Sequence, residues 1–169
     1  PVYHASTILF PSLDALKDFR DKRVAYGRWG TPGTHAFEDA IAEIEAGDRC
    51  LITSSGLSAI STALLSFLKP GDHVLMVDST YEPCRRLCNG FLANLNIETT
   101  YYDPLIGAGI DQLIRPNTKV IYCESPGSLT FEMQDIPAIA KAAKDNTKGE
   151  TDIVVMMDNT WATPLYFKP

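Results

Sequence analysis

The chain has 169 residues, of which 45% are hydrophobic and 21% charged, and its formal net charge is -6 at pH 7. This length suffices for one domain with a buried core, and the composition is that of an ordinary globular protein. The mild negative charge and the lack of a basic cluster argue against nucleic acid as a partner. The apolar runs are too short to span a bilayer and no leader pattern opens the chain, so we expect no membrane partner and a cytoplasmic location.

The four cysteines, Cys50, Cys84, Cys88 and Cys123, are expected to be reduced thiols. Cys84 and Cys88 have the i, i+4 spacing of a metal pair on a helix, but no nearby histidine or cysteine completes a ligand set. The three histidines are scattered along the chain. We therefore predict no metal site.

The first fifty residues are predicted to contain two helices and a glycine-rich loop. Residues 1–11 are expected to be extended, and Ser12 is expected to cap a short helix that follows it. The loop covers residues 26–33 and carries two aromatic residues and an arginine. A second helix is predicted over residues 34–46, because apolar side chains recur there at helical spacing.

From residue 49 onward, short apolar runs alternate with helical segments. Strands are predicted over residues 50–52, 73–77, 97–102, 119–123 and 153–157, and helices over 56–68, 82–93 and 137–144, with a single helical turn at 111–113. Such alternation is typical of an α/β fold with a mostly parallel sheet and helices on both faces.

The end of the last predicted strand carries an acid, because Met156 and Met157 run directly into Asp158. Ligands of open α/β sheets bind at the carboxyl ends of the strands. An acid placed there either pairs with a donor on a ligand or caps the turn that follows. Asp158 by itself does not decide between these two interpretations.

A second candidate is the stretch Ser54-Ser55-Gly56-Leu57-Ser58, which joins a predicted strand to a predicted helix. Glycine lets the backbone approach a ligand, and the free N–H groups and dipole of a helix start favour an anion. The stretch is neither a dinucleotide fingerprint nor a P-loop, so a single phosphate is the natural ligand. The plainer interpretation is a helix start capped by Ser54 or Ser55.

Four further residues, at three places in the sequence, have both a functional and a purely structural interpretation. Tyr26 and Arg28 could clamp a phosphate from their glycine-rich loop, or the loop is simply exposed. Tyr81 follows the strand predicted over 73–77 and could stack on a flat ring, or it lines the rim of the core. Arg86 could face the same site from the next helix, or it is a solvated helix charge.

The combination is more specific than any of its parts. A phosphate-binding helix start, a stacking aromatic and an acid follow three different predicted strands. Together they suit a planar, phosphorylated, positively charged ring. Pyridoxal phosphate has this chemistry, since its pyridinium nitrogen requires an acidic partner.

The motifs resemble those of the Cys/Met-metabolism family of pyridoxal-phosphate enzymes, which have fold type I. They occur in the family's order: Tyr26-Gly27-Arg28, Ser55-Gly56-Leu57-Ser58-Ala59, Tyr81-Glu82-Pro83, Glu124-Ser125-Pro126-Gly127-Ser128 and Asp158-Asn159-Thr160-Trp161-Ala162. Within the family, residues 124–128 and 102–107 are similar to the bacterial cystathionine β-lyase branch.

The resemblance implies a role for each matching residue. The backbone N–H groups of Gly56 and Leu57 would bind the cofactor phosphate, and Tyr81 would stack on the ring. Asp158 would pair with the ring nitrogen. Two residues, Arg86 near the substrate carboxylate and Ser128 near the ring hydroxyl, match the family less closely. Tyr26 and Arg28 would bind the cofactor of a neighbouring subunit, so a dimer would be the smallest competent unit and a dimer of dimers the usual assembly.

The implied reaction is α,β-elimination on L-cystathionine, which gives homocysteine, pyruvate and ammonia. Cystathionine γ-synthase, γ-lyase and methionine γ-lyase are alternatives within the family, and a non-catalytic association module is an alternative of another class. The Schiff-base lysine of the family has no match, because Lys168 lies too close to Asp158 and in a different context. These 169 residues by themselves are therefore expected to be inactive.

The resemblance also implies a division of the chain. Residues 1–33 would form an extended arm and loop that contact a neighbouring subunit. Residues 34–169 would form part of the large cofactor-binding α/β domain, with the remainder of that domain and the small domain outside this sequence.

Overall fold

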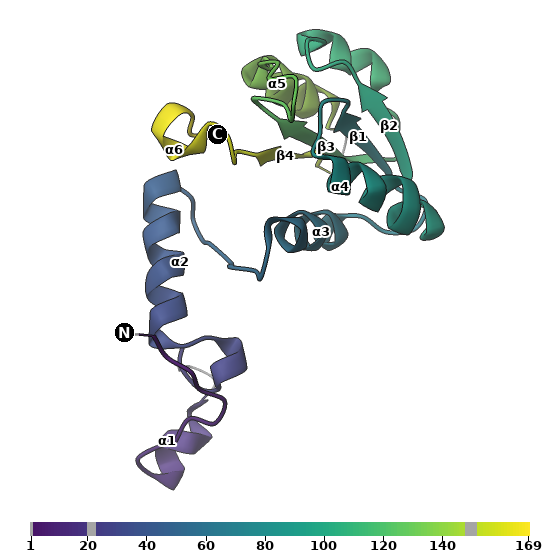
Figure 1. Cartoon of the computed structure of the whole chain (residues 1–169). Helices are drawn as coiled ribbons and strands as arrows, with labels where there is room; N and C mark the ends of the chain where they lie inside the picture. Colours follow the sequence, from purple (N-terminus) through teal and green to yellow (C-terminus); the bar gives the residue numbers. More distant parts are fainter. Residues whose placement is uncertain (1, 20–22, 148–151) are drawn as a thin grey trace. The chain divides into compact units, whose positions relative to one another are not determined.

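The computed structural model describes residues 2–19, 23–147 and 152–169 (Figure 1). The chain divides into two compact units, Pro1–Ile52 and Thr53–Pro169, and we describe each by itself.

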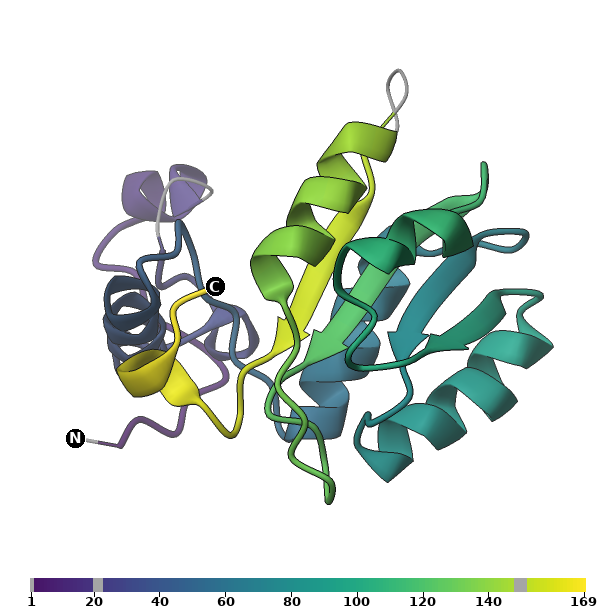
Figure 2. The same ribbon diagram turned by 90° about the horizontal axis from the view of Figure 1, so that it is seen from above.

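The second unit is built on a four-stranded parallel sheet with the strand order β2-β1-β3-β4 (Figure 2). The strands are β1 (His73–Val77), β2 (Glu98–Tyr102), β3 (Thr118–Glu124) and β4 (Val154–Asp158). Because all four strands are parallel, their carboxyl ends meet at one edge of the sheet. The predicted parallel sheet is thus confirmed.

Helices cover both faces of this sheet, as predicted. The helices are α3 (Gly56–Phe67), α4 (Glu82–Arg86), the π-helix η3 (Leu87–Leu92), the 3-10 helix η4 (Gly107–Leu113), α5 (Ile136–Asn146) and the short α6 (Thr163–Tyr166). Val74 and Met76 of β1 pack against α3, α4 and η3, whereas Leu75 and Val77 pack against η4 and α5. Figure 2 shows α5 in front of the sheet and α3 behind it. The alternation of side chains along β1 therefore separates two apolar cores.

The first unit contains α1 (Leu13–Lys17), the 3-10 turn η2 (Gly27–Trp29) and α2 (Pro32–Glu45). Ser12 caps α1 as predicted, since its side chain accepts a hydrogen bond from the N–H of Ala15. An antiparallel bridge joins Thr7 to Tyr26. Neither α1 nor α2 has a buried residue, so this unit has little core of its own.

Several predicted elements differ in the structure. The single turn predicted at 111–113 is the longer 3-10 helix η4, and the helix predicted over 82–93 is divided into α4 and the π-helix η3. Residues 50–52 have no regular secondary structure, because a strand requires a neighbouring strand and none pairs with them in the described part of the chain. The helix predicted over 34–46 begins two residues earlier, at Pro32. Thr31 and Thr34 form reciprocal capping hydrogen bonds there, and proline suits the first turn of a helix.

Candidate functional site

A cavity of about 640 Å³ lies at the carboxyl ends of β3 and β4 and beside the N-terminus of α3. Its lining brings together five residues predicted from the sequence: Gly56, Leu57, Tyr81, Ser128 and Asp158. The other lining residues are Ser55, Ile60, Thr80, Glu82, Glu124, Leu129, Thr160 and Trp161. The parallel sheet explains why these residues lie together, because the loop that follows each strand lies at the same edge of the sheet.

The N-terminus of α3 forms one wall of the cavity. Ser55, not Ser54, is the cap, and its Oγ accepts a hydrogen bond from the N–H of Ser58 at 3.2 Å. The first turn of a helix leaves N–H groups without helical acceptors, so those of Gly56 and Leu57 are available to an anion. A Cβ added to Gly56 would meet no atom within 4 Å, which shows that the cavity is open at this residue.

Two carboxylates end neighbouring strands, because Glu124 of β3 and Asp158 of β4 are register partners. Glu124 is only 3% exposed, and three protein donors occupy its oxygens. Asp158 is half-buried and accepts hydrogen bonds from the Thr160 N–H at 3.0 Å and from the Tyr122 phenol at 3.5 Å. Asp158 accepts two hydrogen bonds from the protein and Glu124 accepts three, so the half-buried Asp158 keeps the larger acceptor capacity for a ligand.

Tyr81 stands at the start of α4, is 46% exposed as a residue, and lines the cavity. Its backbone N–H donates to Oε2 of Glu124 at 2.7 Å. The backbone is thus fixed while the aromatic ring remains accessible to a ligand. Trp161 lines the same cavity and packs edge to face against Phe131, with ring centroids 5.0 Å apart.

Ser128 also lines the cavity, but its hydroxyl donates to Oε1 of Glu124 at 2.5 Å. The only hydrogen of that hydroxyl is therefore already used within the protein. Its oxygen can still accept a hydrogen bond from a ligand.

Arg86, Tyr26 and Arg28 are not among the residues that line the cavity. Arg86 forms an exposed ion pair with Glu82 on the same helix, and it does not line the cavity. Tyr26 and Arg28 belong to the first unit, where the Arg28 guanidinium lies 5.9 Å from the centroid of the Tyr26 ring. The Ser6 hydroxyl lies 3.3 Å from the Tyr26 phenol oxygen and donates to it.

Sequence reasoning did not assign a role to Glu124 or to Trp161, although both stand in the motifs that carry the family resemblance. The signal for Glu124 was the same as for Asp158: an apolar strand that ends in an acid. Trp161 had no comparable signal, because an aromatic residue after a strand is also common in a core.

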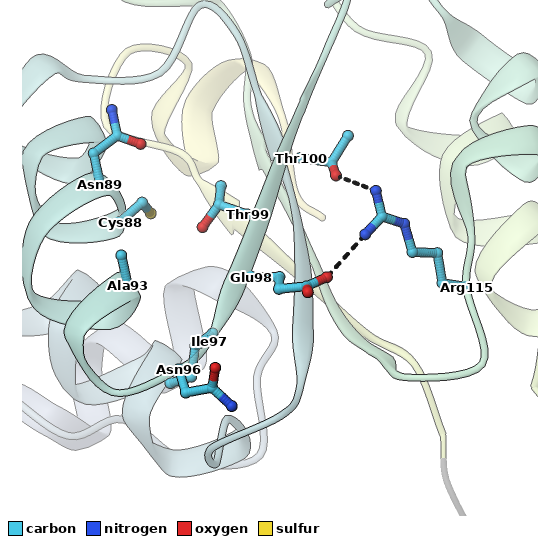
Figure 3. A pocket seen from close by; sticks show the side chains of 9 residues that line it. All are labelled: Cys88, Asn89, Ala93, Asn96, Ile97, Glu98, Thr99, Thr100 and Arg115. Atoms are coloured by element: carbon cyan, nitrogen blue, oxygen red, sulfur yellow. Dashed lines mark hydrogen bonds and ion pairs between the residues drawn. The ribbon is translucent and has the colours of Figure 1, made fainter.

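A second cavity, of about 570 Å³, borders β2 at the edge of the sheet (Figure 3). Arg115 is its only basic lining residue among those that the structure describes. The guanidinium donates to Glu98 at 2.9 Å and to Thr100 at 3.0 Å. Since Glu98 already pairs with this charge, the cavity at β3 and β4 is the better candidate for a ligand.

The fold and the cavity together indicate a class: an α/β protein whose cavity residues suit a phosphorylated aromatic cation. The model of the family described as "Cys/Met metabolism PLP-dependent enzyme" matches residues 1–169, and the chain belongs to this family. The resemblance predicted from the motifs is therefore confirmed.

Named relatives and a solved structure agree with this assignment. The chain is 45% identical to a cystathionine beta-lyase of Haemophilus influenzae over 168 residues, which is 97% of this chain and 42% of the relative. It is 42% identical to an L-alanine/L-glutamate racemase of Wolbachia pipientis over 182 aligned residues, with 100% of this chain and 43% of the relative covered. The crystal structure of cystathionine gamma-lyase from Lactobacillus plantarum complexed with L-serine superposes with a TM-score of 0.85 at 31% identity, over 97% of this chain and 40% of that one. The chain thus spans about two-fifths of the length of these proteins.

The residues of the cavity suit pyridoxal phosphate, the cofactor named in the family description. The start of α3 offers N–H groups and open space for a phosphate, Tyr81 offers an accessible ring, and Asp158 offers an acceptor for a ring N–H. No lysine lines the cavity among the residues that the structure describes.

The described residues also contain no helix long and apolar enough to cross a membrane. Within the same residues, no group of three or more histidine, cysteine or acidic side chains is arranged to hold a metal ion.

Proposed function

We propose that the full-length protein is a cystathionine β-lyase, which uses pyridoxal phosphate to cleave L-cystathionine into homocysteine, pyruvate and ammonia. One observation carries this proposal: a single cavity joins the start of α3, the Tyr81 ring and the Asp158 carboxylate. The similarity to the Haemophilus influenzae enzyme supports the choice of substrate. When bound, the cofactor supplies an electron sink that stabilises negative charge at the substrate α-carbon.

Each wall of the cavity has its own task in this proposal. The N–H groups of Gly56 and Leu57 bind the phosphate at the positive end of the α3 dipole. Tyr81 lies against the ring and limits its movement. Asp158 accepts a hydrogen bond from the ring nitrogen and holds the proton there, which maintains the positive charge of the ring.

Part of the first unit contributes to a neighbouring subunit. In this proposal residues 1–33 form an arm, and Tyr26 and Arg28 bind the cofactor phosphate of the neighbour with a phenol and a guanidinium. Residues 34–169 belong to the large cofactor-binding domain. The assembly is then a homo-oligomer, a dimer of dimers, with no nucleic-acid or membrane partner.

A polypeptide of these 169 residues alone is expected to be inactive. Its cavity has no lysine among the described lining residues that could bind the cofactor aldehyde and accept the substrate α-proton. This polypeptide, mixed with pyridoxal phosphate and treated with borohydride, should show no adduct at one specific lysine. Such an adduct would contradict the expectation.

The substrate class can be tested by incubating the full-length protein with L-cystathionine. Pyruvate as the keto acid product supports the β-lyase, whereas α-ketobutyrate alone would show a γ-lyase and contradict the proposal. A second candidate, amino-acid racemisation, is favoured by the Wolbachia pipientis relative. Conversion of L-alanine to D-alanine without pyruvate formation from cystathionine would establish that alternative.

A cytoplasmic location is part of the same proposal. The four cysteines are free thiols in the structure, and three of them are buried. Unpaired cysteines are usual in reducing compartments, which supports this location. Fractionation of the producing cells would test it.

A further inference from the structure

The buried carboxylate of Glu124 connects two loops at the carboxyl edge of the sheet. Its Oε2 accepts hydrogen bonds from the Tyr81 N–H at 2.7 Å and from the Thr80 hydroxyl at 3.2 Å. Its Oε1 accepts one from the Ser128 hydroxyl at 2.5 Å. Thr80 and Tyr81 follow β1, whereas Ser128 follows β3. A carboxylate suits this place because it accepts at both oxygens and donates at neither.

The same two loops also touch through their backbones. The N–H of Ser128 donates to the carbonyl oxygen of Ser79 at 2.8 Å. Gly127 lies so close to Ser79 that an added Cβ would stand 2.4 Å from its Oγ and 2.6 Å from its Cβ. Glu124 is thus the charged centre of a tight contact between the loops.

This contact fixes the backbone from which the Tyr81 ring projects into the cavity. Tyr81 as a whole residue is 46% exposed, so protein packing alone does not hold its ring. A buried carboxylate is costly, and a neutral acceptor would satisfy a single N–H more cheaply. Glu124 accepts hydrogen bonds from three donors beside the cavity. The orientation of the residues that carry these donors explains this arrangement better than a gain in stability does.

We propose that Glu124 is a positioning residue, whose buried carboxylate holds the Tyr81 backbone so that the aromatic ring stands ready against a bound cofactor. This inference rests on the proposed function only in taking pyridoxal phosphate as the ligand of the cavity. It does not depend on which amino acid is cleaved.

The test compares Glu124→Gln with the wild type in the full-length holoenzyme. Glutamine keeps the shape of the side chain but removes its negative charge, so the hydrogen bonds from Tyr81 and Thr80 lose their charge assistance. We expect the Tyr81 amide hydrogen to exchange faster, and the Kd for pyridoxal phosphate to rise about tenfold. Amides at the centres of β1 and β3, at Leu75 and Ile121, should keep their wild-type exchange rates.

Glu98→Gln is the matched control. Glu98 begins β2 at the opposite end of the parallel sheet, and its carboxylate pairs with Arg115. The same chemical change there should alter neither the Tyr81 exchange rate nor the Kd.

Unchanged Tyr81 exchange and unchanged affinity in Glu124→Gln would overturn the inference. Equal acceleration at Tyr81, Leu75 and Ile121 would show a merely structural role and would overturn it as well. If Glu124→Gln does not fold, Thr80→Val removes one donor and leaves the carboxylate in place; a smaller change in both readouts is expected, and none would reject the proposal. The Tyr81 exchange rate and the Kd for pyridoxal phosphate are both measured without following pyruvate. A failure of the β-lyase assignment would therefore be distinguishable from a failure of this inference.

Discussion

The phenol of Tyr122 donates a hydrogen bond to Oδ2 of Asp158 across 3.5 Å. Burial raises the pKa of Tyr122 above its usual value, so the phenol stays protonated and remains a donor. The other oxygen, Oδ1, accepts from the Thr160 N–H at 3.0 Å. Both oxygens are therefore oriented, and the half-buried carboxylate keeps lone pairs for a donor in the cavity.

Replacing Asp158 by Asn should weaken cofactor binding without unfolding the protein. The amide keeps the shape of the side chain but loses the charge that, in the proposed function, holds a proton on the ring nitrogen of the cofactor. A charge-assisted hydrogen bond contributes about 1.5–3 kcal/mol, so we expect the Kd for pyridoxal phosphate to rise roughly ten- to hundredfold. Fluorescence titration of the full-length apoprotein measures this constant.

Tyr122→Phe is the control for Asp158→Asn. It removes one long hydrogen bond and leaves the carboxylate charge, so its effect on the Kd should stay below about tenfold. An equal loss in both variants would show that the orientation of Asp158, and not its charge, matters most.

Replacing Gly56 by Ala separates ligand binding from folding. The added Cβ would meet no protein atom within 4 Å and would stand in the open space at the start of α3. Stability should not fall, because alanine has the higher helix propensity. A methyl group that intrudes on the phosphate should cost about 1–3 kcal/mol of binding, which raises the Kd at least about fivefold.

Gly90→Ala provides the comparison for this variant. Its Cβ would also meet no atom within 4 Å, but Gly90 lies in η3 and does not line the cavity. The Kd of the Gly90→Ala variant for pyridoxal phosphate should equal that of the wild type. Equal affinity of Gly56→Ala and the wild type would argue against phosphate at the start of α3.

Much of this arrangement could be predicted from the sequence because it depends on local patterns. The apolar run before Asp158 indicated a strand that ends at the acid, and the turn at Gly56 indicated a helix start. The different states of Glu124 and Asp158 could not be predicted, because both acids follow an apolar strand. The loop after β1 supplies two of the three donors to Glu124, since it brings Tyr81 and Thr80 to Oε2. That meeting depends on the strand order, which local patterns do not encode.

The strand predicted over 50–52 failed for a related reason. Its apolar residues satisfy the local pattern, yet Leu51 is 75% exposed and no strand pairs with this segment in the described residues. Strand formation depends on a partner that is distant in the sequence, and a single-segment pattern contains no information about that partner.

Buried His73 should make stability depend on pH. Its imidazole nitrogens lie 2.8 Å from the Thr118 hydroxyl and 2.9 Å from the Thr100 hydroxyl. Burial, with a further contribution from the nearby Arg115 charge and an opposing one from Glu98, lowers the pKa of His73 to about 4. In the unfolded chain the same imidazole has a pKa of about 6.5. The contribution of the neutral His73 imidazole to the free energy of unfolding is therefore complete above about pH 6.5 and is lost as the pH falls toward 4.

His73→Gln isolates that effect, because glutamine can bond both hydroxyls but does not titrate. Between pH 7 and pH 4.5 the wild type should lose about 2 kcal/mol more of its unfolding free energy than the variant does. Urea unfolding at the two pH values measures the difference. Parallel losses in the two proteins would show that His73 is not the titrating group.

Replacing Gly27 by Ala should disrupt the first unit around Tyr26 and Arg28. The Gly27 N–H donates to the Ser6 carbonyl oxygen at 2.7 Å, and an added Cβ would stand only 1.7 Å from the carbonyl oxygen of Ala5. The clash is with backbone, so no side-chain rotation relieves it. We expect a local destabilisation of about 2 kcal/mol or more, seen as faster proteolysis near residue 27.

Gly47→Ala is the matched control in the same unit, since its Cβ would meet no atom within 4 Å. It should change stability by less than about 0.5 kcal/mol. If Tyr26 and Arg28 bind the cofactor of a neighbouring subunit, Gly27→Ala should also weaken binding of pyridoxal phosphate by the oligomer, whereas Gly47→Ala should not. Faster proteolysis of Gly27→Ala with unchanged cofactor affinity would contradict the cross-subunit role while leaving the fold of the unit as described.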